Sequence, residues 1–264
     1  MKQPLVLAID IGSSSIRGAL YDGNADPIRR TSIAIRHSFE RTIDGGSVMD
    51  AEECVVRVIA CIDAILVRSS TLKVEIAAVA ICSFWHSLVG IDANGKPTTK
   101  LLGWADTRGR KYAAVLKKRF NEKVTHNRTG AHFHSSFWPA KLLWLRNEFP
   151  DVFAVTERWL SFSDFIALRL FGEPTTSVSM ASATGIFDIR KCTWDAELLK
   201  FLKIKTSALP AIADTNSKTF RLNKRFAKRW PRLKDAKWFP AIGDGAADNI
   251  GAGCVTKNKA AWLG

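Results

Sequence analysis

The sequence lacks long apolar runs, paired cysteines and the common nucleotide-binding motifs. No apolar stretch reaches the roughly 18 residues that a membrane-spanning helix needs, and the N-terminal residues contain no signal-peptide cleavage site. Neither a GxxxxGK[ST] loop nor a helix-opening GxGxxG is present. These absences argue against a membrane protein, a Walker-type nucleotide site and a dinucleotide fingerprint. We therefore expect a cytoplasmic protein with no membrane partner.

The cysteines form no C-x-x-C pair, are odd in number and are scattered along the chain: Cys54, Cys61, Cys82, Cys192 and Cys254. This distribution is typical of reduced thiols in a core and not of a disulfide framework. His126, His132 and His134 lie close in sequence, but cysteine or carboxylate partners at zinc-ligand spacing are missing. The sequence therefore favours neither disulfides nor a zinc site.

The net charge of +14 is strongly basic, and much of it is local. Residues 218–237 contain nine Lys or Arg and a single acid, Asp235. Such a stretch could bind nucleic acid, but it contains no repeat, no zinc-ligand spacing and no known binding module. We favour a solvated face or a field that attracts an anionic small substrate, and we do not expect nucleic acid as a partner.

The order of apolar segments predicts an α/β domain. At 264 residues the chain is long enough for one large domain or two smaller ones with a substantial core. Residues 5–11, 16–21 and 27–36 predict three strands in a meander. A helix then begins after Asp50, and residues 74–81 predict another buried strand. Three strands, a helix and a further strand are the opening of a ribonuclease-H-like domain, with a mixed sheet flanked by helices.

The connection between the first two strands is the first candidate site. Asp10 ends one strand, and residues 12–15 must make a tight turn before Arg17. Such a turn can present backbone N–H groups, hydroxyls and one cation to an anion, beside a carboxylate that holds hydrated magnesium. The pattern predicts a phosphate site formed by Gly12, Ser13, Ser14, Ser15 and Arg17, with Asp10 binding the metal through water. An ordinary hairpin with a Gly-Ser turn would give the same pattern.

Two further stretches place aromatic and charged side chains after predicted strands. Trp85 and His86 follow the strand at residues 74–81, at the edge where open α/β sheets bind ligands. Trp104, Asp106 and Arg108 precede a basic helix, and an indole can pack on a sugar ring while charged groups bind hydroxyls or an anion. A packed aromatic beside a core histidine, and an aspartate that caps a helix, are the structural alternatives.

The last candidate site lies in residues 239–254. A predicted strand ends at Gly243, and a helix of small residues is expected from Ala246 onward. Asp244 lies between two glycines at the N-terminus of this helix, and the helix dipole would keep its carboxylate ionised. The flanking glycines leave room for a ligand to approach, although a simple N-cap is the alternative role.

Taken in order, these stretches resemble the motifs of the FGGY carbohydrate kinases, and most of all the gluconokinase branch. Residues 10–17, DIGSSSIR, resemble the first phosphate motif of the family. Trp104-x-Asp106-x-Arg108 is similar to W-x-D-x-R, and residues 244–251 are similar to the catalytic aspartate segment. Further similar segments are residues 85–88, 129–130, 140–144 and 181–185, so the match covers essentially the whole chain. Two residues depart from the pattern: Trp85 replaces the usual Met, and Asp248 replaces a small residue.

The resemblance implies ATP-dependent phosphorylation of a primary hydroxyl on a sugar or sugar acid, with ATP and Mg²⁺ as cofactors. It implies gluconate as the substrate and 6-phosphogluconate as the product, with xylulose or another ketopentose as the alternative. Asp244 would be the general base. The residues implied in binding ATP phosphates are Asp10, Gly12, Ser13, Ser14, Ser15 and Arg17, and those implied in binding the sugar are Trp85, His86, Trp104, Asp106, Arg108, Asp244 and Gly245.

The resemblance also divides the chain into two unequal parts. Residues 1–240 would be the sugar-binding amino-terminal domain, and residues 241–264 the beginning of an ATP-binding domain. Residues 261–264 resemble only the start of the family's second phosphate motif, so we expect a truncated form that is inactive alone. A non-catalytic sugar-binding remnant and a basic nucleic-acid binder are the rival hypotheses. The sequence leaves the assembly open, including a homodimer.

Overall fold

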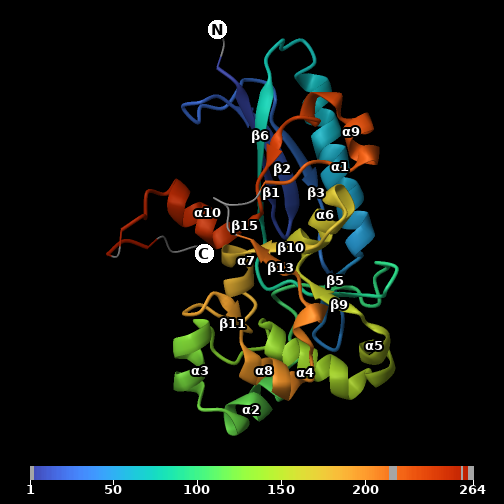
Figure 1. The fold of residues 1–264 in the computed structure, drawn as a ribbon, viewed down its shortest axis with the longest axis vertical. Coiled ribbons are helices and arrows are strands. Elements are labelled where there is room, and N and C mark those ends of the chain that lie inside the picture. The colour runs from blue at the N-terminus through green and yellow to red at the C-terminus, as the bar shows by residue number, and fades with distance from the viewer. Residues whose placement is uncertain (1–2, 214–218, 257, 261–264) are drawn as a thin grey trace.

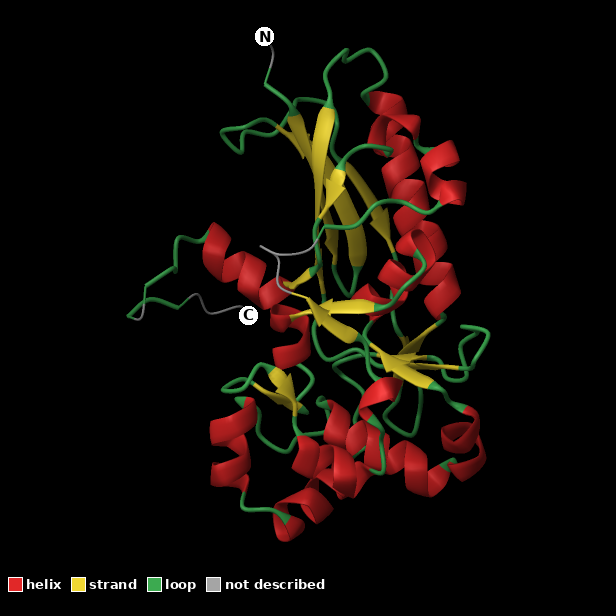
Figure 2. Ribbon diagram, viewed as in Figure 1, coloured by secondary structure: helices red, strands yellow, loops and turns green. Residues whose placement is uncertain are grey.

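The computed structural model describes residues 3–213, 219–256 and 258–260. Figures 1 and 2 show a twisted sheet with helices against one face at one end of the molecule, and a layer of helices at the other end. Short strands connect the two parts. The sequence resemblance noted for residues 261–264 lies outside the described residues.

The main sheet is built around the first strand, whose alternate residues are buried because successive side chains point to opposite faces. Its strands are β1 (Leu5–Ile11), β2 (Ser15–Tyr21), β3 (Ile33–Arg36), β6 (Ile76–Ser83), β14 (Lys237–Trp238) and β15 (Ile242–Gly243). β1, β2 and β3 form an antiparallel meander, while β6 pairs parallel with β1, and β14 and β15 pair parallel with β6. The order β14-β6-β1-β2-β3 confirms the predicted ribonuclease-H-like domain.

One face of this sheet is covered by helices. They are α1 (Ala51–Arg68), α6 (Phe162–Phe171) and α9 (Lys224–Arg229), which lie on the same side of the sheet in Figure 1. Asp50 caps α1 as predicted, since its side chain accepts a hydrogen bond from the backbone N–H of Glu53. The apolar faces of α1 and α6 share one buried core with β1 and β6.

A second core lies in the helical layer. Its helices are α2 (Arg110–Arg119), α3 (Glu122–Thr129), α4 (Trp138–Glu148), α5 (Pro150–Val155) and α8 (Ala196–Leu202). Helix α4 lies centrally and contacts α2, α5 and α8. Its first eight residues are all buried, including a lysine. A helix that is buried on all sides is typical of a core. Helix α4 therefore forms the centre of the helical layer, on which α2, α5 and α8 pack.

The remaining elements are short and join the two parts. They are β4 (Glu40–Arg41), β5 (Ser47–Met49), β7 (Val89–Ile91), β8 (Leu101–Leu102), β9 (Arg158–Leu160), β10 (Thr175–Ser177), β11 (Phe187–Asp188), β12 (Thr193–Trp194), β13 (Ala211–Ala213), α7 (Val178–Ser182), α10 (Asp244–Gly251) and the 3-10 turns Thr206–Ala208 and Pro231–Leu233. The strands pair as β4-β5-β8, β7-β9, β10-β13 and β11-β12. They bring the loops after β6 and β8 close to α4.

Two expectations about local structure need correction. The third strand begins at Ile33 and not near Pro27, because Thr31 bonds back to Ile28 through its N–H and its hydroxyl and so closes a turn. All the cysteines are free, but the expectation of core thiols holds only for Cys54 and Cys61, since Cys192 is exposed. Among the described residues, no helix combines the length and hydrophobicity of a membrane span.

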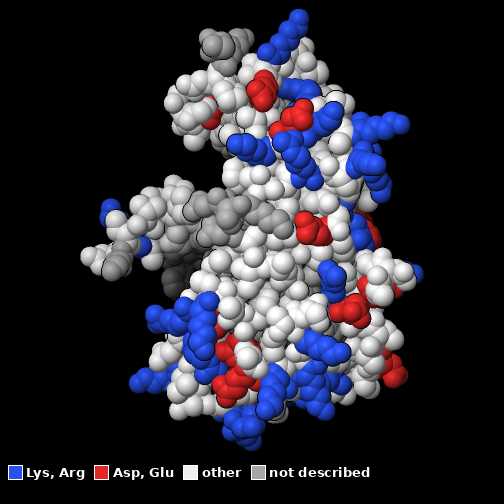
Figure 3. All heavy atoms as spheres, viewed as in Figure 1, with Lys and Arg blue, Asp and Glu red and all other residues white. Residues whose placement is uncertain are grey.

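Two arginines of the basic stretch at residues 219–237 contact α1 or the residues that follow it. Arg229 pairs with Asp63 on α1 at 2.5 Å, and Arg232 donates to the carbonyl oxygen of Ser69, which follows the end of α1, at 3.0 Å. Cations are favourable at a helix C-terminus because they complement its dipole. Figure 3 shows Lys and Arg scattered over the visible face with acidic residues between them. These contacts give Arg229 and Arg232 structural roles at α1.

Candidate active site

His37 holds the turn between β1 and β2 through hydrogen bonds to its backbone. The N–H of Gly12 donates to the carbonyl oxygen of Ser15 at 3.0 Å, and the N–H of His37 donates to that of Ser14 at 3.0 Å. The His37 ring Nε2 lies 2.7 Å from the Gly12 carbonyl oxygen, so Nε2 must donate and Nδ1 is an acceptor. Nδ1 is buried and has no partner among the described residues. Burial also lowers the pKa of His37, which favours this neutral form.

Three carboxylates and a thiol gather where β1, β6 and α10 meet. The Cys82 thiol donates to Asp10 Oδ1 at 3.3 Å. Burial raises the pKa of Cys82, and the charges of Asp10, Asp244 and Asp248 raise it further. Cys82 is therefore a protonated donor and not a nucleophile. This cluster places Asp10 and Asp244 together, as the sequence motifs require.

The pKa of Asp244 is shifted in the direction opposite to the one expected from the helix dipole. Helix α10 begins at Asp244, two residues before the predicted start, and the Gly245 N–H donates to Asp244 Oδ1 at 2.9 Å. Burial nevertheless raises the pKa of Asp244, because desolvation outweighs this hydrogen bond and the one from the Trp85 N–H. The negative charges of Asp248 and Asp10 raise it further. A carboxylate with a raised pKa is a stronger base when ionised.

Trp85 packs directly against the backbone on both sides of Asp244. A Cβ placed on Gly243 would lie 1.6 Å from the Trp85 Nε1 atom, and one on Gly245 would lie 2.6 Å from its Cζ3 atom. Only glycine therefore fits at these two positions while the indole stays where it is. The Trp85 Nε1 atom is buried without a partner among the described residues. The glycines around Asp244 admit the indole, which is a more specific reason for them than ligand access.

His86 adopts a left-handed backbone conformation, with a φ of 64°. Its Nδ1 lies 2.6 Å from the carbonyl oxygen of Ala183, and its ring centroid lies 4.6 Å from that of Phe137. Burial lowers the pKa of His86 to about 4, so the ring is neutral at physiological pH, with its proton on Nδ1. A left-handed histidine is uncommon and requires surrounding structure to hold it.

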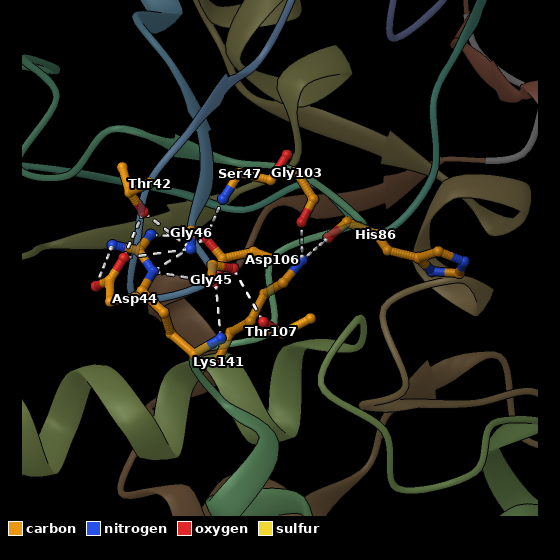
Figure 4. Close-up of polar contacts among 11 residues, drawn as sticks. Thr42, Asp44, Gly45, Gly46, Ser47, His86, Gly103, Asp106, Thr107 and Lys141 are labelled. Carbon is orange, nitrogen blue, oxygen red and sulfur yellow. Dashed lines mark hydrogen bonds and ion pairs between the residues drawn. The ribbon is translucent and has the colours of Figure 1, made fainter.

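The three predicted site residues on the loop after β8, Trp104, Asp106 and Arg108, differ in how deeply they are buried. The Trp104 side chain is 50% exposed, whereas Asp106 is 1% exposed. Asp106 accepts hydrogen bonds from the N–H of Ser47 at 3.1 Å and from Arg108 Nη2 at 2.6 Å. The Arg108 guanidinium lies 4.4 Å from the ring centroid of Trp144. Figure 4 shows Asp106 directed into this network, which includes residues 42–47. Trp104 is left facing solvent, while Asp106 and Arg108 bind each other.

Two hollows flank the β1–β2 turn. A pocket of about 280 Å³ is lined by residues that include Ser13, Ser14, His37, Arg41, Ser47 and Trp104. A larger hollow of about 570 Å³, over the sheet face opposite α1, is lined by residues that include Asp10, Arg17, Cys82 and Ala247. The predicted phosphate-binding residues are thus divided between the two hollows. Ser13 and Ser14 line the pocket beside Trp104, whereas Asp10 and Arg17 line the hollow beside α10.

The motifs assign no role to three residues of this region, His37, Arg41 and Lys141, although Lys141 lies in the segment 140–144 that resembles the family. Nothing in the sequence around His37 or Arg41 marks them, because strand β3 and the short β4 bring them to the turn only in the folded chain. Arg41 has no ion-pair partner within the described ranges. Lys141 offered one signal, a lysine inside the apolar helical segment WPAKLLWL.

The carboxylate cluster suits a hydrated magnesium ion. Within the residues that the structure describes, no three His, Cys, Asp or Glu side chains are arranged as a complete metal site. The charges of Asp10 and Asp248 nevertheless disfavour ionisation of Asp244, and a divalent cation would relieve this repulsion. Oxygen donors with several retained waters are what Mg²⁺ prefers. These residues would fit a magnesium ion held through water beside Asp10.

Comparison with known proteins finds carbohydrate kinases of similar sequence and fold. The chain is 25% identical over 256 residues to the gluconokinase of Bacillus subtilis (strain 168), a match covering 97% of this chain and 49% of that protein. It is 26% identical over 252 residues to the xylulose kinase of Lactococcus lactis (strain IL1403), a match covering 96% and 50% of the two chains. The crystal structure of gluconate kinase from Lactobacillus acidophilus superposes with a TM-score of 0.87 at 29% identity, covering 95% of this chain and 50% of that one.

The chain therefore spans about half the length of the relatives that it matches. The family model described as the FGGY family of carbohydrate kinases, N-terminal domain, matches residues 5–251. This range contains the β1–β2 turn, the Trp85 and Trp104 loops and Asp244. The chain belongs to the FGGY family of carbohydrate kinases, and the matched part is the N-terminal domain of that family.

Proposed function

We propose that this chain supplies the sugar site and the catalytic base of an ATP-dependent kinase that phosphorylates a sugar acid, most specifically gluconate. The observation that carries the proposal is the meeting of Asp244, Asp10 and Trp85 beside the β1–β2 turn, since both carboxylates influence the same thiol and Trp85 packs on either side of Asp244. We further propose that residues 1–240 form the sugar-binding domain and residues 241–264 the beginning of the ATP-binding domain.

In the proposed mechanism, Asp244 accepts the proton of the sugar's primary hydroxyl as the hydroxyl oxygen attacks the γ-phosphorus. A positioned general base is worth about 10²- to 10⁴-fold in rate. The N–H and hydroxyl groups of residues 12–15 and the Arg17 guanidinium would hold the transferred phosphoryl group, because phosphoryl transfer depends on positioning and charge stabilisation. Arg17 is oriented by its Nε, which donates to Ser15 Oγ at 3.1 Å. Magnesium held through water by Asp10 would neutralise charge on the phosphates.

The sugar would extend from the pocket of about 280 Å³ beside Trp104 toward Asp244, which lies outside the lining of that pocket. The half-exposed indole offers an apolar wall for the C–H face of the sugar. His37 lines this pocket, but its Nδ1 is buried, so it would act by holding the Gly12 carbonyl of the turn. Trp85 and His86 would shape the side nearest Asp244, whereas Asp106 and Arg108 would act by fixing the loop that carries Trp104.

Arg41 favours a sugar acid over a neutral sugar. The sequence suggested Arg108 for contact with a carboxylate, but Arg108 pairs with Asp106 at 2.6 Å and lies 4.0 Å from Asp44. Its charge is therefore compensated within the protein. Arg41 lines the same pocket as Trp104 and has no ion-pair partner among the described residues. A carboxylate in the pocket would provide that partner.

Replacing Arg41 by Gln is expected to weaken gluconate binding by about tenfold, because a hydrogen bond to a charged group contributes about 1.5–3 kcal/mol. Xylulose carries no charge, so its affinity should change by less than about twofold under the same substitution. Isothermal titration calorimetry of the 264-residue chain with each compound measures both effects. Binding of xylulose without binding of gluconate would instead assign the site to a ketopentose.

A further inference from the structure

Lys141 is a fully buried lysine whose ammonium group bonds to two loops at once. Its exposed fraction is 0%. The Nζ atom donates to the carbonyl oxygen of His86 at 2.6 Å and to that of Gly103 at 2.9 Å. Figure 4 shows the side chain rising from α4 and ending between these two carbonyl groups. The residues after His86 and Gly103 diverge into β7 and toward α2, so Lys141 lies where the two loops approach each other.

The two carbonyl groups belong to the two loops that carry the predicted sugar residues. Trp85 and His86 form one of them, and Trp104, Asp106 and Arg108 form the other. Burial of a lysine is costly unless the charge is compensated, and neither loop presents a carboxylate to Nζ within hydrogen-bonding distance. Both carbonyl dipoles point at the ammonium instead. A methionine of the same length would leave both carbonyl groups without this donor.

Other residues of α4 hold the same loops. Trp138 Nε1, three positions earlier on the helix, donates to the carbonyl oxygen of Ser87 at 2.8 Å. Trp144, three positions later, lies under the Arg108 guanidinium. A Cβ on Gly109 would lie 3.0 Å from the backbone of Ala140. Residues three apart share a helix face, so α4 presents one continuous surface to both loops, with Lys141 at its centre.

The Lys141 amine can donate to both carbonyl oxygens whether it is charged or neutral. Burial lowers the pKa of Lys141 to about 7, the charge of Asp106 raises it, and that of Arg108 lowers it. The His86 ring, whose own pKa is lowered to about 4, adds no positive charge at neutral pH. Asp106 thus compensates both Arg108 and Lys141, while the two carbonyl oxygens accept from the ammonium hydrogens.

We propose that Lys141 is a positioning residue, whose ammonium group fixes the separation of the Trp85–His86 loop and the Trp104–Arg108 loop and so sets the width of the sugar site. The effect on sugar binding rests on the proposed function, but the clamp itself does not. Lys141 touches neither sugar nor phosphate in this arrangement. It acts through the backbone of His86, which needs support in its left-handed conformation, and through the backbone of Gly103 next to Trp104.

The first test needs no sugar and uses hydrogen–deuterium exchange of the whole chain. Several amides of the two loops are hydrogen-bonded, including those of Leu88, Gly103 and Thr107, and exchange slowly while the loops are fixed. Lys141→Met should accelerate exchange by about tenfold or more in peptides covering residues 84–88 and 103–108. Peptides from β1 and α1 should exchange as in the unaltered protein. Unchanged exchange in both loops would overturn the proposal.

Leu145→Ala is the matched control, because Leu145 is buried one turn along the same helix and packs in the apolar core. It should loosen the helical layer generally without the selective effect on the two loops. Lys141→Met and Leu145→Ala are compared at equal distance from their own unfolding midpoints. Equal exchange patterns would mean that Lys141 contributes only to packing and would contradict the proposal.

A measurement on the unaltered protein covers the case in which Lys141→Met does not fold. In nitrogen-15 NMR, a lysine ammonium bonded to two buried carbonyl groups should exchange its hydrogens far more slowly than surface lysines do. Lys141→Arg, which keeps the charge and two donors, should retain gluconate binding to within about threefold, whereas Lys141→Met should lose about tenfold or more. A fast-exchanging ammonium, or equal losses for Arg and Met, would refute the clamp. If the unaltered chain binds no sugar, only the proposed function fails.

Discussion

Replacing Asp244 by Asn is expected to lower the rate of sugar phosphorylation by about 10²- to 10⁴-fold. The amide keeps the size of the side chain but cannot accept the proton of the attacking hydroxyl. The substitution would leave the packing of Trp85 against Gly243 and Gly245 intact, so the sugar KM should change little. The assay is release of ADP from ATP with gluconate as acceptor, by protein that includes an ATP-binding domain. Retention of turnover within about tenfold would show that another group acts as the base.

Asp248→Asn is the control for this substitution, since Asp248 lies one turn further along α10 and its charge raises the pKa of Asp244. Asp244 is a base only when ionised, so activity falls as the pH drops through its pKa. Removing the charge of Asp248 lowers that pKa, and the acid limb of the pH profile should therefore move to lower pH. A shift to higher pH, or a loss of turnover as large as for Asp244→Asn, would contradict the assigned roles.

Replacing Trp138 by Ala is expected to destabilise the chain by about 3–5 kcal/mol, the cost usual for truncating a buried aromatic side chain. Trp138 is 0% exposed and lies in the second core. Its indole N–H also donates to the carbonyl oxygen of Ser87, which would lose its partner. Denaturant unfolding of the 264-residue chain, followed by circular dichroism, measures this change.

Trp104→Ala, in contrast to Trp138→Ala, should affect sugar binding much more than stability. The Trp104 side chain is 50% exposed, so its removal should change the free energy of unfolding by no more than about 0.5 kcal/mol. Sugar binding should nevertheless weaken strongly, because the apolar wall of the pocket is lost. The account would be wrong if Trp104→Ala destabilised the chain as much as Trp138→Ala, or if it left gluconate affinity unchanged.

The fold could be predicted from the sequence because its signals are local. The apolar run at residues 5–11, the Gly-Ser turn and the cap at Asp50 each specify an element within a few residues. Their order then leaves few arrangements for an α/β domain. The start of β3 could not be predicted, because the turn at Ile28 depends on a hydroxyl bond that the alternating pattern of residues 27–36 does not reveal.

The site could be predicted only as a set of residues and not as a geometry. Asp10, Trp85 and Asp244 do converge, as the motifs suggest. The depth of Asp106 depends on Ser47, which is 59 positions away, and the bonds of Lys141 reach 55 and 38 positions along the chain. Such long-range contacts leave no periodic signal. The raised pKa of Asp244 also depends on the folded chain, since it comes from burial and from the charges of Asp248 and Asp10.

The most direct test of the account is a calorimetric titration of the 264-residue chain with gluconate, xylulose and glycerol, each with and without Mg²⁺ and ATP. The account predicts saturable binding of gluconate that Trp104→Ala abolishes and Asp244→Asn leaves nearly unchanged. A chain that is folded by circular dichroism but binds none of the three compounds at millimolar concentration would contradict the claim that this domain is the sugar site of a carbohydrate kinase.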